Sequence, residues 1–159
     1  MNFDKTINLL NKFLNIHNER IENYEINILE TIDQDLKSIL YKFQKKCYES
    51  QSELMTEIIN LGGEPIIETI NSKRFLHLWL DFKNVFIPTN REDLLHICEY
   101  NEYVNIKKIR SLLQINSHVL NQQQNQIITK QLDVLLKNHD YLKILSELLL
   151  QENKKVQKN

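Results

Sequence analysis

The residues of this sequence whose types could do chemistry are a few polar side chains that interrupt apolar helical stripes. Glu102 falls on one stripe of residues spaced three and four apart, and Gln131 and His139 fall on another. His17 lies on a third stripe, and Glu25 lies on the same predicted helix. Carboxylates and imidazoles are seldom buried without a hydrogen-bond partner, an opposite charge or a metal ion. These five side chains are therefore the candidates for a functional site.

One interpretation of this polar layer is a metal site. Glu25, Glu102 and His139 fall near the middle of the predicted helices, within a few turns of one another at about 1.5 Å of rise per residue. Their oxygen and nitrogen atoms are suitable ligands for iron, manganese or zinc. The other interpretation, which we favour, involves no cofactor: Glu102, Gln131 and His139 satisfy one another by hydrogen bonds and fix the register of the helices.

The signature of a di-iron centre is missing from the sequence. Such centres in ferritin-like proteins use a Glu from each of two helices and a Glu-x-x-His pair from each of the other two. None of the five histidines has a Glu three residues before it. The second predicted helix also offers Cys47 and Ser50 at its inward mid-bundle positions, where carboxylates would be needed. We therefore expect no intact di-iron centre, and we assign no catalytic residue.

Four long helices must position the polar layer. Apolar residues recur at three and four rather than at two, and every Gly and Pro falls between residues 62 and 88. Asp33 or Thr31 is suited to cap the second helix, and Thr89 with Glu92 has the form of a capping box for the third. We expect one domain over residues 1–150 and a basic disordered tail over 151–159. The helices are predicted at about 5–30, 33–61, 90–114 and 118–150, with a short helix at about 75–86 in the crossover.

Two helical hairpins joined by one long crossover are typical of ferritin-like folds. The sequence therefore predicts an all-α fold, a ferritin-like four-helix bundle.

Five segments of the chain resemble a known family. The resemblance covers about residues 7–148 and implies a fold and a bacterial setting, but it supplies no activity and no catalytic residues. In their order, the segments are similar to a bacterial domain-of-unknown-function family of ferritin-like four-helix-bundle proteins. They read NIHNERIENYE at 15–25, ELMTEIINLGGEP at 53–65, HLWLDFK at 77–83, CEYNEYV at 98–104 and QLDVLLKNHDYLK at 131–143.

Composition narrows the classes of partner. The 20 Lys and Arg residues nearly balance the 21 Asp and Glu residues, and the two signs are interspersed. Nucleic acid and membrane are poor partners for such a surface, because both require a concentrated basic face. No apolar run approaches the roughly 20 residues of a membrane span, so we expect a cytoplasmic protein.

Cys47 and Cys98 lie outside any CxxC pattern and are expected to be reduced core thiols.

Two functions remain open at this level. The first is a non-enzymatic helical module that acts by self-association, for example as a dimer, or through a protein partner. Its support is the apolar side chains of the crossover, which exceed what one helix face can bury, namely Leu76, Trp79, Leu80, Phe82, Val85 and Phe86. The alternative is a metal-binding ferritin-like protein of a bacterial stress response, with a reduced or degenerate metal site.

Overall fold

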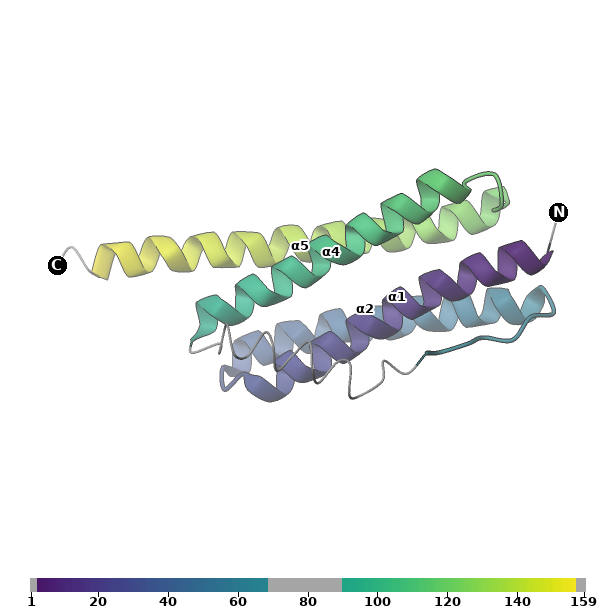
Figure 1. Ribbon diagram of the computed structural model, residues 1–159. Helices are drawn as coiled ribbons and strands as arrows, with labels where there is room; N and C mark the ends of the chain where they lie inside the picture. The colour runs from purple at the N-terminus through teal and green to yellow at the C-terminus, as the bar shows by residue number, and fades with distance from the viewer. Residues whose placement is uncertain (1–2, 69–89, 157–159) are drawn as a thin grey trace.

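Four helices make up most of the chain that the computed structural model describes, which comprises residues 3–68 and 90–156. No strand occurs within these two ranges. The predicted all-α four-helix bundle is confirmed, whereas the predicted crossover helix at 75–86 lies outside the described residues. The helices are α1 (Phe3–Glu30), α2 (Gln34–Asn60), α4 (Arg91–Asn116) and α5 (Gln122–Val156) (Figure 1).

The first hairpin is formed by α1 and α2, which pack along each other. Asp33 caps α2, because its Oδ1 accepts hydrogen bonds from the backbone N–H groups of Asp35 and Leu36 at 3.1 and 3.2 Å. After α2, Gly62 has a φ of 79°, in the left-handed region that glycine adopts without strain. Both features agree with the sequence: Asp33 is one of the two predicted caps, and Gly62 directly follows the predicted helix at 33–61.

Contacts between distant segments fix the direction of each helix. The hydroxyl of Thr6 donates to the carbonyl of Val119, and Arg91 forms an ion pair with Asp33, so α4 runs antiparallel to α1. The side chain of Gln124 donates to Glu57 at 2.9 Å, so α5 runs antiparallel to α2. The helices α2 and α4 therefore point one way and α1 and α5 the other, as Figure 1 shows.

The chain after α2 turns back along α1 toward the end of the bundle where α4 begins (Figure 1). The side-chain amide of Asn11 binds this segment through both of its polar atoms. Nδ2 donates to the carbonyl of Glu64 at 3.2 Å, and Oδ1 accepts from the N–H of Ile66 at 2.7 Å. Farther along α1, Oδ1 of Asn15 accepts from the N–H of Glu68 at 2.8 Å. Side-chain amides of α1 thus satisfy backbone groups that have no helix to pair with.

The apolar core is divided into two clusters. One surrounds Leu10, Leu54 and Leu135, and the other surrounds Leu36 and Leu95. Burying one such Leu side chain contributes about 1.5–3 kcal/mol, so the two clusters supply most of the drive for folding. On α1, α2 and α4, residues 17–20, 50 and 102 fall between the two clusters along their helices, and most of them are polar and buried. On α5, Gln131 is buried among residues of the first cluster. Among the described helices, none has the length and apolar content to span a bilayer.

Three helix ends differ from the predictions. Asn90 rather than Thr89 caps α4, because its Oδ1 accepts from the N–H of Asp93 at 3.0 Å; Thr89 itself lies outside the described residues. The fourth helix begins at Gln122 instead of 118, because Asn121 and Gln124 exchange hydrogen bonds as a capping box. Residues 151–156, which we expected to be disordered, continue α5. Gln, Glu and Lys are good helix formers, and lysines near a helix C-terminus interact favourably with the helix dipole.

Candidate functional site

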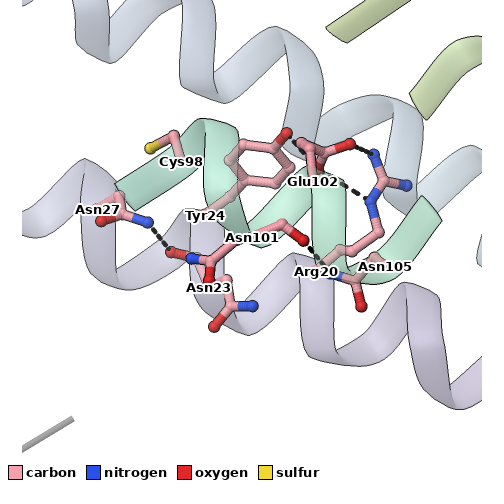
Figure 2. A pocket seen from close by; sticks show the side chains of 8 residues that line it. All are labelled: Arg20, Asn23, Tyr24, Asn27, Cys98, Asn101, Glu102 and Asn105. Carbon is pink, nitrogen blue, oxygen red and sulfur yellow. Dashed lines mark hydrogen bonds and ion pairs between the residues drawn. The ribbon is translucent and has the colours of Figure 1, made fainter. Parts of the chain in front are cut away.

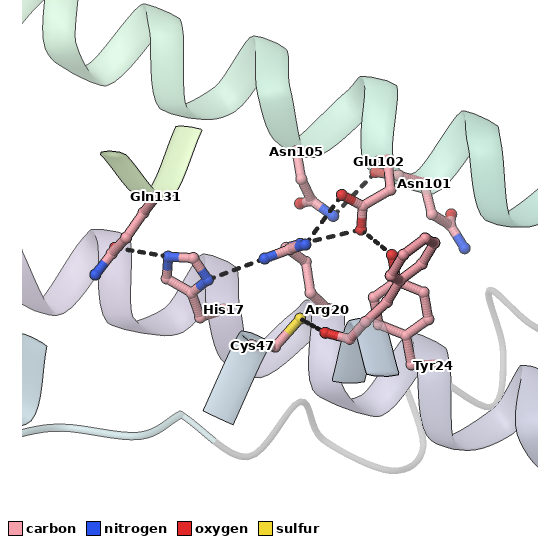
Figure 3. Close-up of polar contacts among 9 residues, drawn as sticks. His17, Arg20, Tyr24, Cys47, Asn101, Glu102, Asn105 and Gln131 are labelled. Carbon is pink, nitrogen blue, oxygen red and sulfur yellow. Dashed lines mark hydrogen bonds and ion pairs between the residues drawn. The ribbon is translucent and has the colours of Figure 1, made fainter. Parts of the chain in front are cut away.

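A buried ion pair connects α1 and α4 near the middle of the bundle. The Nε of Arg20 donates to Oε1 of Glu102 at 3.1 Å, and Nη2 donates to Oε2 at 3.0 Å. The two side chains are only 1% and 2% exposed. The phenol of Tyr24 donates a further hydrogen bond, of 2.6 Å, to Oε1 of the same carboxylate. Glu102 therefore accepts three hydrogen bonds in a two-pronged, charge-assisted arrangement (Figure 3).

The network continues from Arg20 to the other two helices. Nη1 of Arg20 donates to Nδ1 of His17 at 3.1 Å, so the imidazole proton is assigned to Nε2, which faces Oε1 of Gln131 at 3.0 Å. Nε2 of Gln131 in turn donates to Oε2 of Glu53 at 2.8 Å and to the carbonyl of Ser50 at 3.3 Å. Hydrogen bonds thus join all four described helices. We call His17, Arg20, Tyr24, Glu102 and Gln131 the polar layer.

Burial and the neighbouring charges determine which members of the polar layer are ionised. Burial, reinforced by the positive charge of Arg20, lowers the pKa of His17 from 6.5 to about 3, so its imidazole is neutral at physiological pH. Burial and the negative charge of Glu102 hold the pKa of Tyr24 well above its usual range. For Arg20, burial disfavours the charge, but Glu102 together with the neighbouring Cys47 and Tyr24 outweighs burial and raises the pKa. At neutral pH, the layer therefore holds one guanidinium opposite one carboxylate.

The candidate metal ligands have three separate sets of partners. Glu102 is held by Arg20 and Tyr24, as above. Glu25 is exposed and accepts a hydrogen bond of 3.0 Å from Gln44. His139 lies 3.5 Å from a carboxylate oxygen of Glu99 on α4, measured from its Nε2.

Across residues 3–68 and 90–156, no group of three or more His, Cys, Asp or Glu side chains is arranged to hold a metal ion. The predicted site at Glu25, Glu102 and His139 stays a prediction that metal analysis must test. The predicted hydrogen-bonded layer is present with different members: Glu102 and Gln131 belong to it, whereas His139 does not. Its ring lies against α4, because Nε2 faces Glu99 of that helix, whereas Nδ1 faces Asp140 of α5 itself.

Sequence reasoning missed Arg20, although a signal for it existed. Arg20 follows His17 by three residues and precedes Tyr24 by four, so all three lie near one face of α1. A Glu within an apolar stripe requires an opposite charge, and Arg20 is the basic residue at the matching height of the antiparallel helix. Glu53 is not among the predicted candidates either, although its carboxylate on α2 accepts a hydrogen bond from Gln131.

A small cavity lies beside the ion pair, between α1 and α4 (Figure 2). Four asparagines, Asn23, Asn27, Asn101 and Asn105, contribute to its lining together with Cys98.

The two cysteines, Cys47 and Cys98, are buried and free, as predicted. Burial raises the pKa of the Cys47 thiol to about 12 and that of the Cys98 thiol still further, so neither forms a thiolate nucleophile at neutral pH.

The fold and the site together define an all-α helical-bundle protein whose central polar side chains bind mainly one another. Residues 5–115, more than half of the chain, match the model of a family described as Domain of unknown function (DUF2383). The chain belongs to this family, which confirms the resemblance to a domain-of-unknown-function family. The matched range contains Arg20, Tyr24 and Glu102 and ends before Gln131 and His139. A search of curated proteins finds no match to this chain.

Proposed function

We propose that this chain is a non-enzymatic, ferritin-like helical module of the bacterial cytoplasm that acts by association. The contact we favour is between two copies of the chain, with a protein partner as the alternative. The observation that carries the proposal is a row of exposed apolar side chains on α5, formed by Tyr141, Ile144 and Leu148. Their exposed fractions are 46%, 55% and 51%. We call these three residues the α5 row.

The α5 row is ordered on one face of its helix. Its residues are spaced by three and four, which places them side by side on the surface. The ring of Phe43 on α2 packs edge-on against that of Tyr141, with centroids 5.9 Å apart and an interplanar angle of 87°. This contact holds one end of the row in place. An apolar row held rigid costs less entropy to bury than a mobile one, which favours its use as an interface.

A second copy of the chain fits the α5 row by symmetry. In an antiparallel pair of α5 helices related by a two-fold axis near Ile144, Tyr141 of one copy lies opposite Leu148 of the other. The same patch would then be buried on both sides. The C-terminal end of α5 extends beyond the other three helices in Figure 1.

The helix directions support the ferritin-like assignment. The helices α1 and α5 point one way and α2 and α4 the other, and the longest connection follows α2, which is the course expected when two hairpins are joined by one crossover. The absence of Glu-x-x-His pairs from the sequence separates the chain from the di-iron members of that fold.

Sedimentation equilibrium on three proteins tests the association. We expect the wild type to approach the mass of a dimer as its concentration rises, and Ile144→Glu to remain a monomer, because a buried unpaired carboxylate would oppose pairing. Ile59→Glu is the matched control, since Ile59 is an isoleucine of similar exposure, 59%, on α2. It should associate as the wild type does. A wild type that stays monomeric at every concentration would overturn self-association.

Metal binding is the second candidate, and one distance favours it. The 3.5 Å between Nε2 of His139 and Oε1 of Glu99 is close to the separation of two ligands on one tetrahedral ion, about 3.4 Å for bonds of about 2.0–2.1 Å. This candidate predicts iron, manganese or zinc in the purified protein and its loss in His139→Ala or Glu99→Gln. Elemental analysis that detects no stoichiometric metal, even after iron loading, would remove it.

A further inference from the structure

The cavity between α1 and α4 contains a buried polar atom without a partner. Oδ1 of Asn105 has no hydrogen-bond partner among the described residues, although the side chain is only 3% exposed. The other half of the same amide is satisfied, because Nδ2 donates to the carbonyl of Asn101 at 3.0 Å. Buried carbonyl oxygens in native proteins nearly always accept a hydrogen bond. The partner of this atom must therefore be something that enters the cavity.

The lining of the cavity selects a neutral, polar ligand. Arg20 and Glu102 both contribute to the wall, and their charges are already paired with each other. A free cation would be repelled by the guanidinium, and a free anion by the carboxylate. The phenol of Tyr24 also lines the cavity and already donates to Glu102. Most of the remaining polar lining consists of side-chain amides, each of which offers both a donor and an acceptor. Figure 2 shows these amides on both helices, with Asn23 and Asn27 on α1 and Asn101 on α4.

The size of the cavity is that of a very small molecule. Its volume is about 10 Å³. That volume is at the lower end of the roughly 10–15 Å³ that one water molecule requires, and it is too small for an organic ligand. A buried water normally makes two to four hydrogen bonds, and the amides of this wall supply enough groups for that number.

We propose that this cavity is a binding site for one ordered water molecule, which donates a hydrogen bond to Oδ1 of Asn105. The water bridges Asn105 on α4 to the amides on α1, next to the Arg20–Glu102 ion pair. It thereby adds a second polar connection between these two helices and satisfies the last buried acceptor on that wall. The inference is independent of what the α5 row binds.

Magnetic relaxation dispersion of water nuclei, which counts long-lived internal waters, tests the site. We expect Asn105→Leu to hold one long-lived water fewer than the wild type, because it removes the acceptor and fills the space. Asn138→Leu is the matched control: Asn138 is also buried and also has an unpartnered amide atom, Nδ2, but it does not line this cavity. Asn138→Leu should leave the water of the Asn105 site in place, and a crystal structure of this variant locates that water directly.

Two results would overturn the proposal. One is an unchanged number of long-lived waters in a folded Asn105→Leu protein. The other is a high-resolution crystal structure of the wild type in which Oδ1 of Asn105 accepts from a protein N–H or O–H group and no water lies within hydrogen-bond distance. The crystal structure needs no substitution, so it decides the matter even if Asn105→Leu fails to fold.

Discussion

Glu102 shows how a carboxylate is kept in the core of this bundle. Taking a charge out of water costs several kcal/mol, and an ion pair offsets that cost only when its geometry is good and its remaining atoms are hydrogen-bonded. Both oxygens of Glu102 meet Arg20, and one also meets Tyr24. The pair is therefore stable as a unit, but either partner alone would be a buried, unpaired charge.

Replacing Glu102 should therefore be costly. We expect Glu102→Gln to lower the free energy of unfolding by about 3–5 kcal/mol, because Arg20 would keep its charge and lose its counter-ion. Urea unfolding followed by circular dichroism measures this change. Glu19→Gln is the control, since Glu19 forms an exposed ion pair with Lys108, and it should cost less than about 1 kcal/mol. Equal effects of the two substitutions would contradict the role assigned to Arg20 and Glu102.

His17 should make stability depend on pH in acid. Its pKa is 6.5 in the unfolded chain and about 3 in the folded protein. Below pH 6.5, His17 binds a proton in the unfolded state but not in the folded state. The contribution of His17 to the free energy of unfolding is therefore fully present above pH 6.5 and is lost as the pH drops toward 3. The loss from this one group approaches about 1.4 kcal/mol per pH unit.

The difference between the wild type and His17→Gln isolates this contribution, because all other titrating groups are shared. Chemical unfolding measured at a series of pH values should give a shallower acid slope for the variant. Parallel slopes for the two proteins would show that His17 takes up its proton in the folded state as readily as in the unfolded one.

At the scale of helices, the inward faces were predictable because local spacing determines them. The stripe of Leu10, Leu14, Ile21 and Ile28 on α1 is buried as expected, since residues three and four apart share a face. Helix ends were less predictable. Thr89 and Asn90 are both good capping residues, and only the geometry of the first turn selects Asn90.

The polar layer was predictable only in part. Spacing along one helix shows that Glu102 and Gln131 face inward, but it does not show which residue of another helix each one meets. That choice depends on how each helix is rotated and shifted against its neighbours. His139 is on the expected side of α5, yet a small rotation directs it to Glu99 at the α4 seam instead of the centre. Arg20 reaches Glu102 because its long side chain extends across the α1–α4 seam.

The start of α5 offers a test at the same scale. Asn121→Ala removes the acceptor for the N–H of Gln124 and should lower the free energy of unfolding by about 0.5–2 kcal/mol, as the loss of a helix cap does. Asn121→Asp keeps an acceptor oxygen at the same position and should be close to neutral. Thermal or urea unfolding of the three proteins compares them. An Ala variant as stable as the Asp variant would mean that the capping box contributes nothing.

For the whole molecule, the arrangement of the core argues for a surface function. The hydrogen bonds of the polar layer join all four described helices, and its charged groups are engaged with one another. Such a layer fixes the relative positions of the helices. The outside of the described chain exposes apolar side chains on several helices, and the α5 row is one group of them. We therefore infer that the interior of the bundle sets the register of its helices, and we propose that association involves its surface.

Hydrogen–deuterium exchange at low and high protein concentration tests that assignment most directly. Amides buried in an interface exchange more slowly once the complex forms, so the account predicts added protection at high concentration in the peptides that contain Tyr141, Ile144 and Leu148. Peptides of α1 and α4 around the polar layer should exchange at the same rate at both concentrations. Identical exchange of the α5 peptides at both concentrations, or added protection confined to α1 and α4, would contradict the account.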